Sequence, residues 1–159
     1  MYDNEQTVEL LKKKNWHISF AESCTGGLCC ARLVDVPSAS CVLCASFVTY
    51  AESAKMKLVG VKEKTLQDHG VVSEEVAGEM AEGAAKAAGC EVGVGISGVA
   101  GPSGGSKETP VGTVCFGFSI NGCVKTFTKH FGNLGRSAVR EAAVCFVFQE
   151  LVRELNTTV

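Results

Sequence analysis

Apolar positions recur along much of this chain at the spacing of amphipathic helices. The periodicity is clearest near the two ends and in an alanine-rich stretch that Ser73 can cap and Gly89 can end. Because alanine side chains are short, this middle helix can lie close to a sheet. The predicted helices span residues 5–14, 26–34 (entered through Thr25), 52–58, 74–88 and 135–155.

Short, nearly continuous apolar runs between the helices predict strands. Strands without polar alternation, separated by helices, are typical of a sheet covered on both faces. Asn121-Gly122 between two such runs is a strong hairpin signal and adds an antiparallel pair, so we expect a mixed sheet in an α/β domain. The predicted strands span residues 16–21, 42–50, 91–97, 111–120 and 124–131.

Composition and charge narrow the class of protein. A chain of 159 residues suggests one domain, 1–159. Its composition, with 46% hydrophobic and 20% charged residues, excludes a disordered chain. The net charge of −2 leaves no basic excess for nucleic acid, so no such partner is expected. No apolar run approaches the roughly 18 residues of a membrane span. The start of the chain is polar and charged, so we expect no membrane association and a cytoplasmic location.

Nine cysteines stand mostly among apolar residues, and their number is odd. In a reducing compartment they are expected to act as small buried hydrophobic side chains. Cys41-Val-Leu-Cys44 has CxxC spacing, but no second pair or nearby histidine accompanies it. No metal site is therefore predicted.

Glycine-rich segments are candidates for ligand binding. The first strand ends in Ala-Glu-Ser-Cys-Thr-Gly-Gly (21–27), which can present N–H groups to an anion or simply cap a helix. The GxGxxG at 93–98 is not followed by a helix, and the residues around Lys107 fail the Walker pattern, so no dinucleotide or P-loop site is predicted. The loop 97–106 is long enough to favour a function over a mobile surface loop.

Three side chains could form a nucleophilic site that needs no histidine. Ser40, Tyr50 and Lys55 would be nucleophile, proton relay and base if burial lowers the lysine pKa. All three residue types are common, and a lysine after a strand is usually solvated. Arg136 opens the last helix, where it opposes the helix dipole and so is better placed if it reaches an anion.

Four segments, in this order, resemble the C-terminal domain of the CinA family, the competence/damage-inducible proteins that include the nicotinamide-nucleotide amidohydrolases. The resemblance covers about residues 5–155 and suggests a stand-alone form without the N-terminal molybdopterin-binding-like domain. It implies a three-layer α/β/α fold with a mixed, mostly parallel sheet, in a homo-oligomer. The matching stretches are 21–27, 47–50 with Lys55, 69–74, and 96–102 leading to 110–113.

The resemblance also implies an activity. Members hydrolyse the amide of nicotinamide mononucleotide to nicotinic acid mononucleotide and ammonia in pyridine nucleotide salvage, with no metal or organic cofactor. The serine nucleophile would be Ser40, with Tyr50 and Lys55 as its catalytic partners. The residues implied to bind substrate are Glu22, Ser23, Thr25, Gly26, Ser97, Gly98, Gly101 and Arg136.

Two departures from the family pattern keep alternatives open. The turn before Ser40 lacks the usual glycine, which leaves Ser38 and Ser23 as other candidates for the nucleophile. The segment before Arg136 is one residue longer than usual, which leaves Arg140 as another phosphate ligand. A non-catalytic module for competence or DNA repair is one alternative function. A different amidohydrolase or a nucleotide sensor is another, and ammonia release from the mononucleotide separates all of them.

Overall fold

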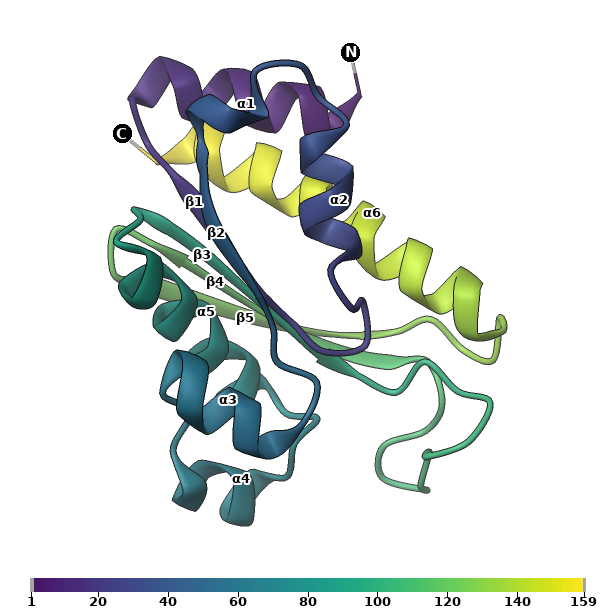
Figure 1. The fold of residues 1–159 in the computed structure, drawn as a ribbon. Helices are drawn as coiled ribbons and strands as arrows, with labels where there is room; N and C mark the ends of the chain where they lie inside the picture. Colours follow the sequence, from purple (N-terminus) through teal and green to yellow (C-terminus); the bar gives the residue numbers. More distant parts are fainter. Residues whose placement is uncertain (1, 159) are drawn as a thin grey trace.

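The computed structural model describes residues 2–158 and has three layers (Figure 1). A five-stranded sheet lies between α1, α2 and α6 on one face and α3, α4 and α5 on the other, so the α/β prediction is confirmed. The helices are α1 (Asp3–Lys14), α2 (Leu28–Val34), α3 (Glu52–Val59), α4 (Glu63–His69), α5 (Glu74–Ala88) and α6 (Arg136–Thr157), with a 3-10 turn η1 (Ala39–Cys41).

The sheet is mixed, in the order β2-β1-β3-β4-β5. β1 pairs in parallel with β2 and β3, whereas β4 is antiparallel to both β3 and β5. Parallel and antiparallel pairings are thus equal in number where a mostly parallel sheet was expected, because no crossover helix follows β3. The strands are β1 (Ile18–Glu22), β2 (Leu43–Val48), β3 (Val92–Gly98), β4 (Thr113–Ile120) and β5 (Cys123–His130).

Most predicted elements are present with ends shifted by a few residues. Asn121 and Gly122 both have positive φ, as the hairpin signal requires. α4 was not predicted, because Leu66 is its only buried residue and seven residues give too little periodicity. Thr25 does not cap α2; Gly27 holds the N-cap position without a side-chain bond.

Glycines on β3 and β4 allow α5 to lie directly on the sheet. A Cβ on Gly93 or Gly95 would collide with the carbonyl oxygen of Ala81 or Ala77 on α5. Gly117 of β4, the sheet partner of Gly95, meets the same helix backbone. Close helix–sheet packing therefore explains the first two glycines of the GxGxxG pattern, whereas the third, Gly98, lies against Thr113 and Val114 at the start of β4.

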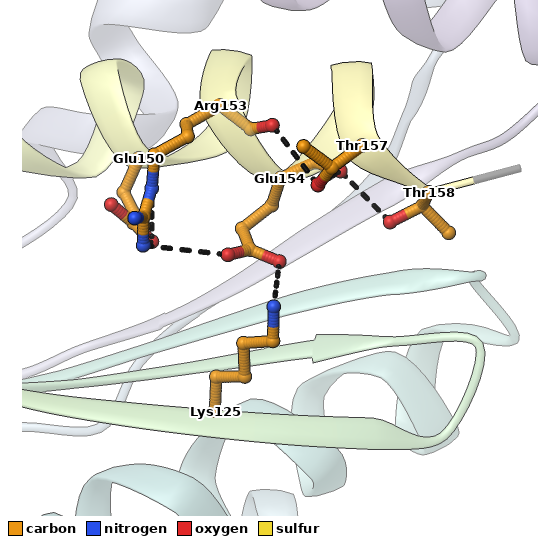
Figure 2. Close-up of polar contacts among 6 residues, drawn as sticks. All are labelled: Lys125, Glu150, Arg153, Glu154, Thr157 and Thr158. Carbon is orange, nitrogen blue, oxygen red and sulfur yellow. Dashed lines mark hydrogen bonds and ion pairs between the residues drawn. The ribbon is translucent and has the colours of Figure 1, made fainter.

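Paired charges fasten the end of α6 to β5 (Figure 2). Glu154 is 5% exposed and accepts a hydrogen bond of 2.6 Å from Lys125 of β5. Arg153 contacts both Glu150 and Glu154, so each buried carboxylate has a cationic partner. This cluster is structural and lies away from the strand ends that form the site described below.

The cysteines only partly follow the expectation of burial. All nine are free thiols, and Cys24, Cys29 and Cys115 are buried. The expectation is wrong for the four exposed ones, because an apolar sequence neighbour does not fix the direction of a side chain. These four are Cys41, Cys44, Cys123 and Cys145. Within residues 2–158, no helix is long and apolar enough to cross a membrane.

Candidate active site

A pocket of about 270 Å³ opens where β1 and β3 end. The carboxyl ends of parallel strands are the usual ligand position in open α/β sheets, and the volume is near the lower limit of about 300 Å³ for small-molecule sites. Five segments contribute: the end of β1, the loop after β2, the segment before α5, the glycine-rich loop and the start of α6. The lining residues are Ser23, Cys24, Tyr50, Val71, Val72, Gly98, Val99, Ala100, Gly101, Ser103, Gly104 and Arg136.

Lys55 lies beneath this pocket, and none of its surface is exposed. Its Nζ is 3.1 Å from the Ser23 Oγ, 2.7 Å from the Thr49 carbonyl oxygen and 3.2 Å from the Tyr50 carbonyl oxygen. An ammonium can donate to all three oxygens. A neutral amine can donate to the two carbonyls and accept the Ser23 hydroxyl proton with its lone pair.

Burial decides which of these forms is favoured. Removal from water lowers the pKa of Lys55, while the nearby Glu52 carboxylate raises it. The desolvation effect is the larger, so the neutral amine is more accessible here than on the surface. The burial that the sequence analysis required of a lysine base is present.

The Ser23–Gly27 turn is anchored by Glu22 and not by an external anion. Glu22 is fully buried, and its carboxylate accepts the main-chain N–H groups of Gly27, Cys29 and Cys30 at 2.9–3.1 Å. The amino end of α2 is therefore already occupied. The substrate-binding roles expected for Glu22, Thr25 and Gly26 are not supported, since none of the three lines the pocket.

Arg136 spans the pocket between two of its walls. Its guanidinium donates to the Gly101 carbonyl oxygen and to the Tyr50 hydroxyl, each at 2.9 Å. Arg140 instead donates to the carbonyl oxygens of Cys24 and Thr25, also at 2.9 Å. Of the two arginines left open by the sequence, Arg136 lines the pocket and Arg140 supports a turn.

Ser97 does not line the pocket. It is 1% exposed, and its hydroxyl donates to the Val71 carbonyl oxygen at 2.7 Å. It therefore holds the segment before α5 against β3, and its expected contact with substrate is not supported. Val71 and Val72 line the pocket but were not identified from the sequence, because only the path of the main chain brings them there.

Ser40 lies at the opposite end of the sheet. It is exposed on η1, just before β2, and the first residue of β2 pairs with Ile18 at the start of β1. The last residue of β1, Glu22, lies four residues or about 13 Å from Ile18 at the usual rise per residue, and Ser23 follows it. Within one copy of the chain, the structure does not bring Ser40 to Lys55, and Ser38 shares its position before β2.

A larger hollow of about 800 Å³ lies between α5 and β5. Its glutamates are unsuited to an anionic nucleotide, and Glu74 is already bonded to Thr126 and Thr128 at 2.7 Å. Within residues 2–158, no three His, Cys, Asp or Glu side chains converge as metal ligands would. The smaller pocket is lined by Arg136 and by Ser23, whose hydroxyl contacts the buried Lys55 amine.

Comparisons with known proteins identify the family of this chain. Residues 3–155 match the model of the CinA C-terminal domain. The nicotinamide-nucleotide amidohydrolase PncC of Enterobacter agglomerans is 47% identical over 155 residues, covering 95% of this chain and 94% of that protein. A competence-damage inducible protein of Clostridium novyi is 46% identical over 96% of this chain, which spans 38% of that longer protein.

Solved structures give the same result for the fold. A competence-damaged protein (CinA) superfamily protein from Klebsiella pneumoniae 700603 has a TM-score of 0.93 and 33% identity, covering 98% of this chain and 97% of that one. The competence/damage inducible protein CihA from Agrobacterium tumefaciens has a TM-score of 0.90 and 35% identity, covering 99% of both chains.

Proposed function

The chain belongs to the CinA C-terminal domain family, and we propose that it is an amidase that hydrolyses the carboxamide of nicotinamide mononucleotide to the acid and ammonia. The observation that carries this proposal is the Ser23 hydroxyl, which lines the pocket and lies 3.1 Å from the Nζ of the fully buried Lys55. The similarity to the amidohydrolase of E. agglomerans supports the choice of substrate.

Ser23 is the proposed nucleophile, one of the candidates the sequence left open. Two carbonyl oxygens fix the position of the Lys55 amine, so the neutral form directs its lone pair at the Ser23 hydroxyl. Ser40 lies on η1 at the other end of β2, and among residues 2–158 the serine hydroxyl that Lys55 contacts is that of Ser23. Tyr50 contributes its carbonyl to this arrangement, and its hydroxyl meets Arg136 at the pocket entrance.

The reaction then needs two transfers of the acyl group, first to the Ser23 Oγ and then to water. The Ser23 proton moves to the Lys55 Nζ as Oγ bonds to the carboxamide carbon. The C–N bond then breaks, and Lys55 returns the proton to the leaving nitrogen, which departs as ammonia. Water attacks the resulting ester, one of its protons passes through Lys55 to the Ser23 Oγ, and nicotinic acid mononucleotide leaves.

The glycine-rich loop supplies donors for the negative charges of substrate and intermediate. Among the described residues, the N–H groups of Ala100, Gly101, Ser103 and Gly104 make no hydrogen bond, and all four residues line the pocket. Such N–H groups can hold the oxyanion and the 5′-phosphate. Arg136 would complete the phosphate site with those of its five N–H donors that its two present bonds leave free.

The experiment compares ammonia release from nicotinamide mononucleotide by the parent chain and by Ser23→Ala, Lys55→Met and Ser40→Ala. We expect turnover only in the parent and in Ser40→Ala, which is the matched control for loss of a serine. An inactive but folded parent would overturn the enzyme proposal and favour a binding module. An active Ser23→Ala with an inactive Ser40→Ala would require a second copy of the chain to bring Ser40 to Lys55.

The two edges of the sheet support a proposal of self-association. No charged residue occurs from Val36 to Ala51, a run that contains the edge strand β2, and Val48 is 51% exposed. The other edge strand, β5, carries Lys125, Lys129 and His130, the kind of residues that protect an edge from pairing. We therefore propose that two copies pair through β2.

Nine free thiols are consistent with the proposed cytoplasmic location.

A further inference from the structure

A buried carboxylate directly before the proposed nucleophile has no part in the chemistry above. Glu22 ends β1, none of its surface is exposed, and it does not line the pocket. A buried carboxylate is costly unless it is hydrogen-bonded, and its three main-chain donors meet that requirement. All three donors come from the entry of α2, so Glu22 connects the end of β1 to that helix.

The turn between them is held from the other side as well. The Ser23 N–H donates to the Ile96 carbonyl oxygen of β3 at 3.0 Å. Arg140 of α6 binds the carbonyl oxygens of Cys24 and Thr25. Of these anchors, only Glu22 fixes the far end of the turn, where Gly26 and Gly27 have positive φ and add flexibility.

We propose that Glu22 is a positioning residue: by binding the amino end of α2 it fixes the Ser23–Gly27 turn and keeps the Ser23 Oγ within reach of the Lys55 Nζ. This inference rests on the proposed function. The carboxylate that raises the pKa of Lys55 is that of Glu52, whereas the Glu22 carboxylate is taken up by three main-chain N–H groups at the entry of α2. The effect of Glu22 is therefore on geometry, where a misplacement of about 1 Å can reduce a rate by about 100-fold.

Steady-state kinetics of Glu22→Gln on nicotinamide mononucleotide test this role. The amide has nearly the same shape, but its NH2 group faces N–H donors and cannot accept from them. We expect kcat to fall at least tenfold, because even a small displacement of the Ser23 Oγ from the Lys55 Nζ slows the reaction. KM should stay within about threefold, and the midpoint of the pH profile of kcat/KM should not move. Glu22→Asp keeps the charge but is too short, so it should be impaired as well. Glu9→Gln, on the exposed face of α1, is the matched control.

Each other outcome contradicts the proposal in its own way. A rise in KM with unchanged kcat would show that Glu22 binds substrate. A shifted pH midpoint would show that its charge acts on Lys55. Unchanged kcat with a lower melting temperature would show a role in stability alone.

A second measurement keeps the test valid if Glu22→Gln does not fold or if the proposed reaction fails. Arg140→Gln loosens the same turn from its exposed side, and it should also lower kcat more than it changes KM. A fluorophosphonate probe labels an activated serine without any nucleotide. Labelling of Ser23 should be at least tenfold slower in both variants than in the parent, and equal labelling rates would overturn the positioning role. An inactive parent whose Ser23 is still labelled would refute the substrate but not the role of Glu22.

Discussion

Arg136→Ala should separate recognition of the phosphate from recognition of the carboxamide. In the structure, Arg136 lines the pocket and donates to two neutral oxygens, those of Gly101 and Tyr50. Nicotinamide mononucleotide carries a 5′-phosphate, whereas nicotinamide riboside does not. The two substrates share the amide at the reaction centre, so they differ only where Arg136 is proposed to act.

The size of the effect follows from the type of bond and its exposure. A hydrogen bond to a charged group contributes about 1.5–3 kcal/mol. Because Arg136 is exposed, we expect the lower end of that range, which corresponds to about a tenfold change. In Arg136→Ala, kcat/KM for the mononucleotide should therefore fall about tenfold and that for the riboside less than twofold.

Initial rates of ammonia release from both substrates test this difference. They are measured at about 0.1 M salt, where the electrostatic screening length is about 10 Å. Arg32→Ala is the control, since Arg32 pairs with Glu141 outside the pocket. Equal losses on the two substrates would refute the phosphate contact. They would mean that Arg136 acts by holding Tyr50 and the glycine-rich loop in place.

Three further results are expected. Glu52→Gln removes an anion that raises the pKa of Lys55, so the acid limb of kcat/KM should move to lower pH; a shift to higher pH would exclude Lys55 as the base. Gly95→Ala forces a Cβ against the Ala77 carbonyl and should lower the free energy of unfolding by about 1–3 kcal/mol in denaturant titrations; an unchanged midpoint would show that α5 can shift. Val48→Lys places a charge on the β2 edge and should give monomers in light scattering, whereas an unchanged mass would place the interface elsewhere.

Secondary structure was largely predictable because it depends on local pattern. The spacing of apolar residues in α1 and α6, the Ser73 cap of α5 and the Asn121-Gly122 turn are all short-range signals. α4 lacked such a signal, since its single buried leucine comes to lie against α5 only in the folded chain.

The site was predictable in part, because the sequence shows which chemical groups are present but not which end of a strand they occupy. Tyr50, Lys55, Gly101 and Arg136 were identified in advance, and the structure brings all four to one place. Ser40 was an equally reasonable serine by sequence separation, being 15 residues before Lys55. Its separation from the amine becomes visible only when β1 and β2 are paired in parallel.

By itself, the sequence determined the family, the α/β class and the presence of a lysine shortly after the uncharged run from Val36 to Ala51, because these depend on residue types and their spacing. Tertiary structure decided that Ser23 meets Lys55, that Glu22 binds main-chain N–H groups, and that Ser97 bonds to the Val71 carbonyl oxygen. The physical reason is that two of the three hydrogen bonds of Lys55 and all three of Glu22 are made with main-chain groups. Every residue carries these groups, so only the path of the folded chain selects which ones meet a given side chain.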